Sequence, residues 1–337
     1  MEILQFYLII LFSLLIFLSI GFLINYKLKV LNQNNIIDLT LFGYSCFVLL
    51  SFFSYFVLTL KSEHLLILIL FFTILFLIKF YKFLKINSKF FKKYLFIISI
   101  FFSIFSLPLI IYGEQFYVFR GNYWDNFNYL SSAVLFSKFD FSYLRTIDLK
   151  NKFQNFQSIE GIILYRPYIN YFLSLFLKFK IFDPFFTNFC FKIFLLILNF
   201  LAFISFLDII KFISKNYKIF LSFVLSLSFF TIYILEIEAL SHLGSISLFL
   251  FCIKYLYLVN LKFEKKNLIF LSISSAALFI IYPEIFIIYC LISFSFFISC
   301  INRVNFINLI KNLLVCSVIF IGLTIFSFEI NYKFLLF

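Results

Sequence analysis

Charged residues are scarce in this sequence. Only 13% of its 337 residues are Asp, Glu, Lys or Arg, whereas soluble domains carry about 25%. Hydrophobic residues make up 64% of the chain, in long runs that lack the alternation typical of a membrane β-barrel. Inside lipid, a helix satisfies its backbone N–H and C=O groups within one segment. We therefore expect an all-α integral membrane protein.

Several familiar signatures are missing as well. The six cysteines form no C-x-x-C pair and fall in apolar runs, which argues against a zinc site and against a disulfide framework. P-loop, Rossmann and zinc-protease motifs are absent, so ATP hydrolysis, dinucleotide chemistry and metalloproteolysis have no support. The first 25 residues lack the basic n-region and the small-residue cleavage site of a signal peptide. We therefore expect residues 3–25 to remain as a membrane span.

The apolar runs predict a polytopic protein with about ten transmembrane helices. The connector at 79–93 carries six lysines and no acid, and the positive-inside rule places it in the cytoplasm. The net charge of +13 therefore comes from basic residues on one side of the membrane, and we expect no nucleic-acid partner. We expect an N-terminal three-span segment with this basic loop (1–93) and a membrane core with a long outer loop at 113–184 (94–337). The predicted spans lie near residues 3–25, 39–60, 64–80, 94–112, 185–208, 219–236, 243–261, 267–281, 285–300 and 308–328.

The apolar stretch 168–179 decides the topology. The basic turns that follow it fall in the cytoplasm only if this stretch does not cross the membrane. Its 12 residues are also short for a hydrocarbon layer of about 30 Å, because a helix rises about 1.5 Å per residue. We expect a helix lying in the outer interface, with its apolar face toward the headgroups and with Lys178 and Lys180 extending to water.

Acidic residues gather on the predicted outer face, where twelve of the fifteen lie under this topology. In the outer loop, residues 126–137 are expected to form a short helix with Asp125 at its start. Tyr129 shares a face of that helix with Asp125 through their i, i+4 spacing. Asp125 either caps the helix by accepting its first N–H groups or takes part in catalysis, and one role does not exclude the other.

Other polar residues are candidates for the same outer site. Arg166 stands at the start of the predicted interfacial helix, where it either binds a phosphate or anchors the chain to headgroups. Lys192 lies inside a predicted span, near its outer end. Three residues in short outer turns either converge on a groove under the long loop or are simply solvated. These are Glu238, His242 and Glu284.

In the order of these elements, the chain resembles bacterial membrane glycosyltransferases of the GT-C superfamily. The resemblance covers residues 94–300. It rests on a basic flank and span before the segment "WDNFNYLSSAVLF" (124–136), on "YRPYINYFLSLFLKF" (165–179), and on a span that ends in the basic turn "FLDIIKFISKNYK" (206–218). Three spans precede the family-like first one and no soluble carboxyl-terminal domain follows, so we expect a short or truncated member.

The resemblance implies a transferase that moves a sugar from a polyprenyl-phosphate carrier to a glycan, lipid or protein acceptor. It places the protein among the lipids of the bacterial inner membrane, with the active face periplasmic or extracellular. Asp125 is then the general base. Tyr129 contributes to substrate binding, and Glu238 or Glu284 binds sugar hydroxyls or a divalent cation. The phosphate charge is expected to be compensated by one or more of four residues: Arg120, Arg166, Lys192 or His242.

Three other functions remain open. Transporters and lipid flippases often show internal repeats and helices broken by glycine or proline, whereas this chain has seven glycines, four prolines and no evident repeat. A surface-glycan polymerase or ligase would depend on outer-loop arginines in place of Asp125. A non-catalytic scaffold would depend on neither. Alanine variants with a surface-glycan readout would separate these functions.

Overall fold

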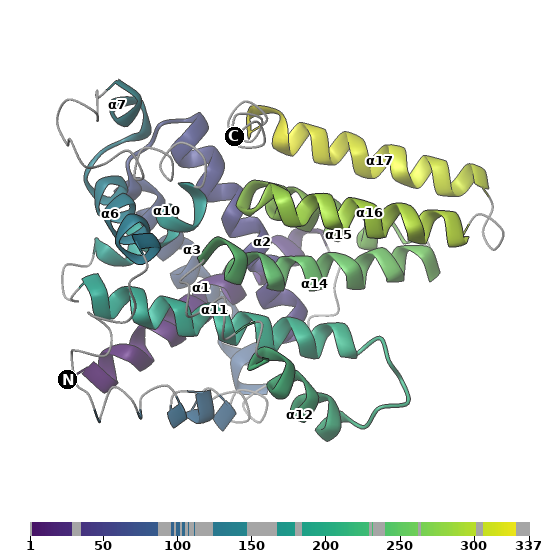
Figure 1. Cartoon of the computed structure of the whole chain (residues 1–337), viewed down its shortest axis with the longest axis horizontal. Helices are drawn as coiled ribbons and strands as arrows, with labels where there is room; N and C mark the ends of the chain where they lie inside the picture. Colours follow the sequence, from purple (N-terminus) through teal and green to yellow (C-terminus); the bar gives the residue numbers. More distant parts are fainter. Residues whose placement is uncertain are drawn as a thin grey trace.

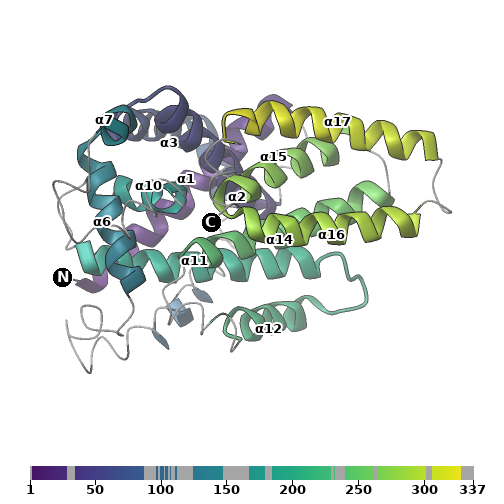
Figure 2. The same cartoon turned by 45° about the horizontal axis from the view of Figure 1, so that its top comes forward.

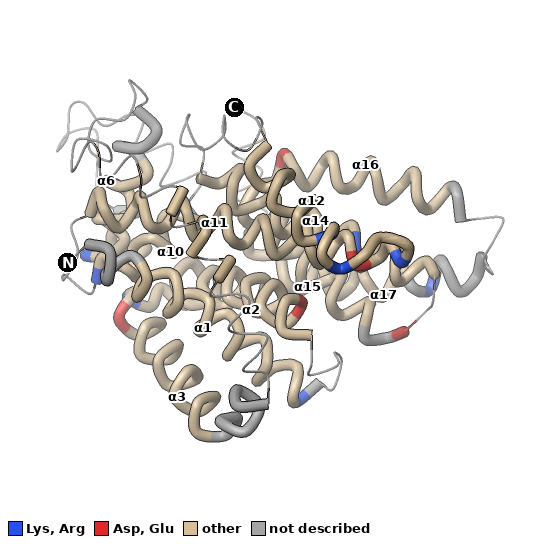
Figure 3. Tube along the Cα trace, turned by 90° about the horizontal axis from the view of Figure 1, so that it is seen from below, with Lys and Arg blue, Asp and Glu red and all other residues tan. Residues whose placement is uncertain are grey.

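The computed structural model describes residues 2–28, 35–86, 124–146, 167–178, 184–228, 240–261, 264–300 and 306–327, with short pieces between 96 and 111 and residue 231. These residues are mostly helical and include no strand, which confirms the all-α class (Figure 1). Charged residues are sparse along the trace (Figure 3).

The elements are α1 (Glu2–Leu28), α2 (Ile36–Ser51), the π-helix η1 (Phe52–Val57), α3 (Ser62–Ile86), α6 (Trp124–Lys138), α7 (Phe141–Thr146), α10 (Pro167–Leu177), α11 (Pro184–Leu207), α12 (Lys215–Ser226), α14 (Leu240–Leu261), α15 (Lys265–Ile281), α16 (Pro283–Cys300), α17 (Phe306–Thr324) and the 3-10 helix η2 (Ile325–Ser327).

Helices occupy most of the described parts of the predicted spans, but the number of helices long enough to cross a membrane is smaller than expected. Four helices are long and apolar enough to cross a membrane: Tyr7–Lys27, Ile36–Val57, Pro184–Leu207 and Leu240–Leu261. The other apolar helical stretches in the described residues are shorter, among them Ser62–Ile78 within α3. The predicted span 94–112 lies largely outside the described residues. The count of about ten spans is therefore not confirmed.

The helices form one bundle with distinct ends (Figures 1 and 2). Helices α6, α7 and α10 gather at the end where α1 and α11 begin, and α14 to α17 lie farther along the bundle. We call the end with α10 the α10 end, and the opposite end, where α2 begins, the Asp38 end. The ring of Tyr168 on α10 lies 5.0 Å from that of Phe56, in the last turns of the continuous helix α2–η1. That helix therefore joins the two ends.

Glycine allows α1 and α2 to approach closely. A Cβ atom at Gly43 would fall on the carbonyl oxygen of Phe17, and one at Gly21 would fall on that of Leu39. Close approach of this kind is typical of small residues where helices cross in membranes. The ring of Phe17 then packs on that of Tyr44, with centroids 5.1 Å apart. This crossing fixes α2, which carries residues at both ends of the bundle.

Helix α10 is a buried helix and not an interfacial one. Its residues from Tyr168 to Phe176 are all buried, and the ring of Phe172 packs on those of Phe17, Phe47 and Phe194. With 11 residues it is about 16 Å long, too short to cross. The prediction of a face toward the headgroups is wrong, because α10 packs against α2, α3, α6 and α11 and against the ring of Phe17 on α1.

Candidate functional site

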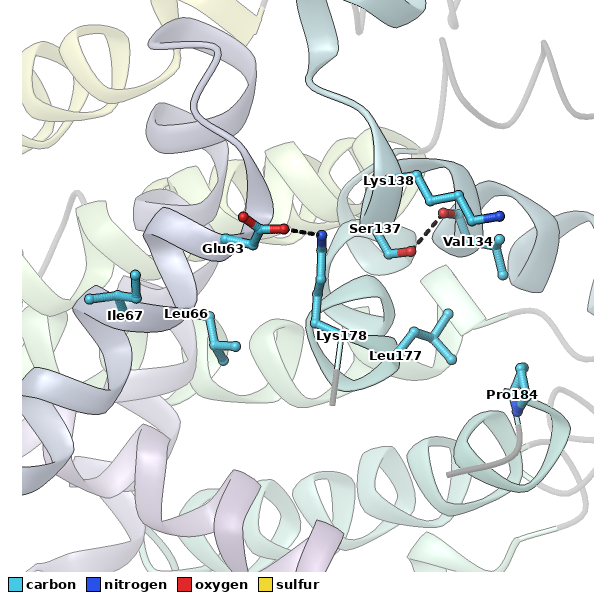
Figure 4. Close-up of a pocket in the computed structure, with 9 residues that line it drawn as sticks. All are labelled: Glu63, Leu66, Ile67, Val134, Ser137, Lys138, Leu177, Lys178 and Pro184. Atoms are coloured by element: carbon cyan, nitrogen blue, oxygen red, sulfur yellow. Dashed lines mark hydrogen bonds and ion pairs between the residues drawn. The ribbon is translucent and has the colours of Figure 1, made fainter. Parts of the chain in front are cut away.

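A groove of about 960 Å³ opens at the α10 end, where α3, α6, α10 and α11 meet (Figure 4). Five of the nine residues that line it are apolar, two are lysines, and the others are one acid and one serine. A concave surface of this size, with apolar walls and a few polar groups, is typical of small-molecule sites. The lining residues are Glu63, Leu66, Ile67, Val134, Ser137, Lys138, Leu177, Lys178 and Pro184.

An ion pair closes one side of this groove. The ammonium nitrogen of Lys178, at the end of α10, lies 2.7 Å from Oε1 of Glu63 in the first turn of α3 (Figure 4). Lys178 is 18% exposed and Glu63 is 60% exposed. The hydrogen bond from Lys178, together with its positive charge, lowers the pKa of Glu63. Lys178 was expected to extend to water, but it connects α10 to α3.

Replacing Lys178 with methionine is expected to raise the pKa of Glu63 toward its ordinary value of about 4.3. The folded pKa is the lower one, so the pair stabilises the protein above the unfolded pKa and loses this effect as pH falls through the folded pKa. Infrared titration of labelled glutamate in Lys178→Met and the wild type would measure the shift. Lys61→Met is the matched control and should have a smaller effect, because Lys61 contributes less. An unchanged pKa in Lys178→Met would contradict the pairing.

Helix α6 is held firmly beside the groove. Tyr129 and Ala133 share a buried face, as their spacing predicts, and α6 packs closely on α10. Just after α6, the carbonyl of Phe139 accepts a hydrogen bond of 2.9 Å from the hydroxyl of Tyr55. Asp140 then accepts hydrogen bonds from the hydroxyl of Ser142 and the N–H of Tyr143, which lower its pKa. These contacts fix the carboxyl end of α6 relative to η1 and α7.

The structure locates some of the predicted site residues. Asp125 lies in the first turn of α6, which confirms that a helix begins there, although its side chain is outside the described residues. Tyr129 is 2% exposed and lies within the protein. Lys192 is buried in α11. Three predicted residues lie outside the described part of the chain: Arg120, Arg166 and Glu238.

His242 and Glu284 lie near the turn between α15 and α16. Nε2 of His242, in the first turn of α14, is 2.7 Å from the hydroxyl oxygen of Tyr282, and their rings are 4.3 Å apart. Glu284 follows two residues later, in the first turn of α16, and is exposed. Tyr282 therefore partners His242, a role that the sequence pattern did not indicate.

A buried ionic cluster at the Asp38 end was not predicted from the sequence. The ammonium group of Lys254 on α14 donates to both carboxylate oxygens of Asp38, at 2.8 and 2.7 Å. Ser205 on α11 donates to Asp38 and accepts from Lys254. Asn35 and Tyr255 also donate to the carboxylate, at 2.8 and 3.1 Å. We call these five residues the Asp38 cluster.

The Asp38 cluster has the properties of a structural tie. The exposed fractions of Lys254 and Asp38 are only 7% and 4%, and buried charges require close partners. Each carboxylate oxygen accepts several hydrogen bonds, so the charge is well compensated. The cluster joins α2, α11 and α14. Along α11, Ser205 is about 31 Å from Pro184 in the groove, so the two sites lie at opposite ends of the bundle.

Within the part of the chain that the structure describes, no group of three or more His, Cys, Asp or Glu residues is arranged to hold a metal ion. A divalent cation at the outer face remains a prediction, since Glu238 is not among those residues.

No family model, no curated protein and no solved structure matches this chain.

Proposed function

We propose that the protein is a membrane glycosyltransferase that moves a sugar from a polyprenyl-phosphate carrier to a glycan, lipid or protein acceptor. The observation that carries this proposal is the position of Asp125, in the first turn of a helix whose Tyr129 and Ala133 face is buried and which packs on α10. A catalytic group needs a rigid support of this kind. Asp125 acts as the general base that removes the proton of the acceptor hydroxyl.

The proposed location is the bacterial inner membrane, with the α10 end on the periplasmic or extracellular face. Helices α3, α15, α16 and α17 and the predicted spans 94–112 and 219–236 cross the membrane together with the four helices named above, which gives about ten spans. Two features support this arrangement. The basic segment 79–93 begins in the last turns of α3, whose first turn lies at the α10 end. Helix α11 begins at Pro184, in the groove at that same end.

The donor phosphate needs cations near Asp125. Arg120 and Arg166 are the proposed partners in the outer loop, with Lys192 and His242 on α11 and α14. Phosphate is a good leaving group, so positioned base catalysis by one carboxylate is the main chemical requirement, and it typically contributes 10²- to 10⁴-fold. Glu238 and Glu284 are proposed to bind sugar hydroxyls.

Asp125→Asn is expected to lower glycan transfer by roughly 10²- to 10⁴-fold, because the amide cannot accept the proton. The test compares surface-glycan profiles of cells that express each variant, with the amount of protein in the membrane measured in parallel. Asp140→Asn is the matched control. It lies just beyond the other end of α6 and keeps an oxygen that can accept from Ser142 and Tyr143, so transfer should persist.

Undiminished transfer by Asp125→Asn would reject the general-base role. If Arg120→Ala and Arg166→Ala abolish the glycan product while Asp125→Asn retains it, the polymerase or ligase function gains support. If none of the three changes alters the profile, the protein does not catalyse glycan assembly.

A further inference from the structure

The groove at the α10 end is separate from the proposed catalytic site. It meets α6 at the last turn, through Ser137 and Lys138, whereas Asp125 lies in the first turn. Thirteen helical residues separate Asp125 from Lys138, which corresponds to about 20 Å. A ligand in the groove is therefore distinct from the acceptor at Asp125, and the two kinds of lining residue indicate the chemistry of that ligand.

An apolar stripe extends from the groove along α3. Ile67 lines the groove and is 65% exposed. Phe71, Ile74 and Ile78 follow at helical spacing on the same side and are 54%, 54% and 74% exposed. The stripe is about 16 Å long from Ile67 to Ile78. It runs from the α10 end, where α3 begins, toward the Asp38 end, so it provides a track for a hydrocarbon chain that starts at the groove.

The polar part of the groove favours an anion. Lys138 is exposed at the end of α6, and Lys178 reaches into the groove from α10. The hydroxyl of Ser137 donates to the carbonyl of Val134 at 2.7 Å, so the two lysines are the groups in the lining that attract an anion. Glu63 neutralises only one of the two lysines, so these four side chains carry a net positive charge. Lysines near the surface of a membrane attract the anionic headgroups of its lipids.

We propose that this groove binds an anionic phospholipid of the surrounding membrane. Its phosphate lies between Lys138 and Lys178, and one acyl chain follows the α3 stripe from Ile67 to Ile78. Glu63 competes with the phosphate for Lys178, because both anions use the same ammonium group. The groove is thus a lipid site with an internal competitor, and Glu63 sets its affinity.

The test is native mass spectrometry of the purified full chain with phosphatidylglycerol or phosphatidylcholine added in increasing amounts. The wild type should retain phosphatidylglycerol and discriminate against phosphatidylcholine. Lys138→Gln and Lys178→Gln should each weaken the retention by about fivefold, the effect of one lysine near an anionic lipid. Glu63→Gln should strengthen it, since Lys178 is then released from its partner. A gain that is confined to phosphatidylglycerol does not result from misfolding, because exposed apolar surface retains both phospholipids.

Two controls test whether retention depends on the lysines and the stripe of this groove. Lys215→Gln removes an exposed lysine at the start of α12 and should leave retention unchanged. Dihexanoyl phosphatidylglycerol and inorganic phosphate should bind weakly, because neither can occupy the α3 stripe. Equal retention of the two phospholipids by the wild type, or no change in any of the three groove variants, would overturn the proposal.

The lipid-retention measurement tests the groove independently of the proposed function. Asp125→Asn should bind phosphatidylglycerol like the wild type, because the two sites are about 20 Å apart along α6. Loss of glycan transfer with normal lipid retention would support the general base alone. If the groove variants alter lipid retention and Asp125→Asn transfers glycan like the wild type, the lipid site alone is supported.

Discussion

Replacing Lys254 with methionine is expected to destabilise the protein by about 3–5 kcal/mol, because it leaves the buried carboxylate of Asp38 without its ionic partner. Asn35, Ser205 and Tyr255 would still donate hydrogen bonds, but these three groups carry no charge. Thermal unfolding of the purified protein in detergent would measure the loss. Asp38→Asn should be destabilising for the converse reason, since Lys254 is then a buried cation without an anion.

The double variant Asp38→Asn/Lys254→Met is the decisive comparison. Removing both charges eliminates the uncompensated ion, so the double variant should be more stable than either single variant. Lys178→Met is the matched control for the loss of a lysine. Its partner Glu63 is largely exposed, and surface pairs contribute little. If the two single changes and the double change all unfold at the wild-type temperature, the Asp38 cluster does not stabilise the bundle.

Replacing Gly43 with alanine is expected to cost at least about 3 kcal/mol, at the upper end of the range for overpacking. The added methyl group would fall on the backbone carbonyl of Phe17, and a backbone atom of a packed helix cannot turn aside as a side chain can. Helices α1 and α2 must then separate, which also disrupts the ring contact between Phe17 and Tyr44. Size-exclusion chromatography and thermal unfolding would detect the loss of folded protein.

Gly322→Ala provides the control for this substitution. Gly322 lies in α17, and a Cβ atom there would meet nothing within 4 Å. Alanine has the higher helix propensity, by about 1 kcal/mol, so this variant should be as stable as the wild type or slightly more stable. If Gly43→Ala behaves in the same way, the two helices do not cross as closely as the structure places them.

The helix positions follow from the sequence because each is a local property. A run of about 20 apolar residues forms a helix whatever surrounds it, and α1, α11 and α14 begin and end close to the predicted limits. The start of α6 at Asp125 is equally local. The ends of a helix depend on nearby residues, which are visible in the sequence.

The environment of α10 and the Asp38 cluster could not be predicted in the same way. An apolar helix of 11 residues suits both a membrane surface and a protein interior, and the packing of distant helices around it decides between them. The sequence did indicate that Lys254 needs a partner, since it is the one charged residue in the predicted span 243–261. Its partner, however, is 216 residues away in the sequence, and no local rule identifies it.

That separation has a consequence for how the protein is made. At about 5–20 residues per second, a ribosome needs roughly 10–40 s to progress from Asp38 to Lys254. Throughout this interval, the nascent chain holds Asp38 without Lys254, so the ion pair that joins α2 to α14 cannot form. The Asp38 cluster is therefore completed only after α14 has been synthesised, when about three quarters of the 337 residues are in place.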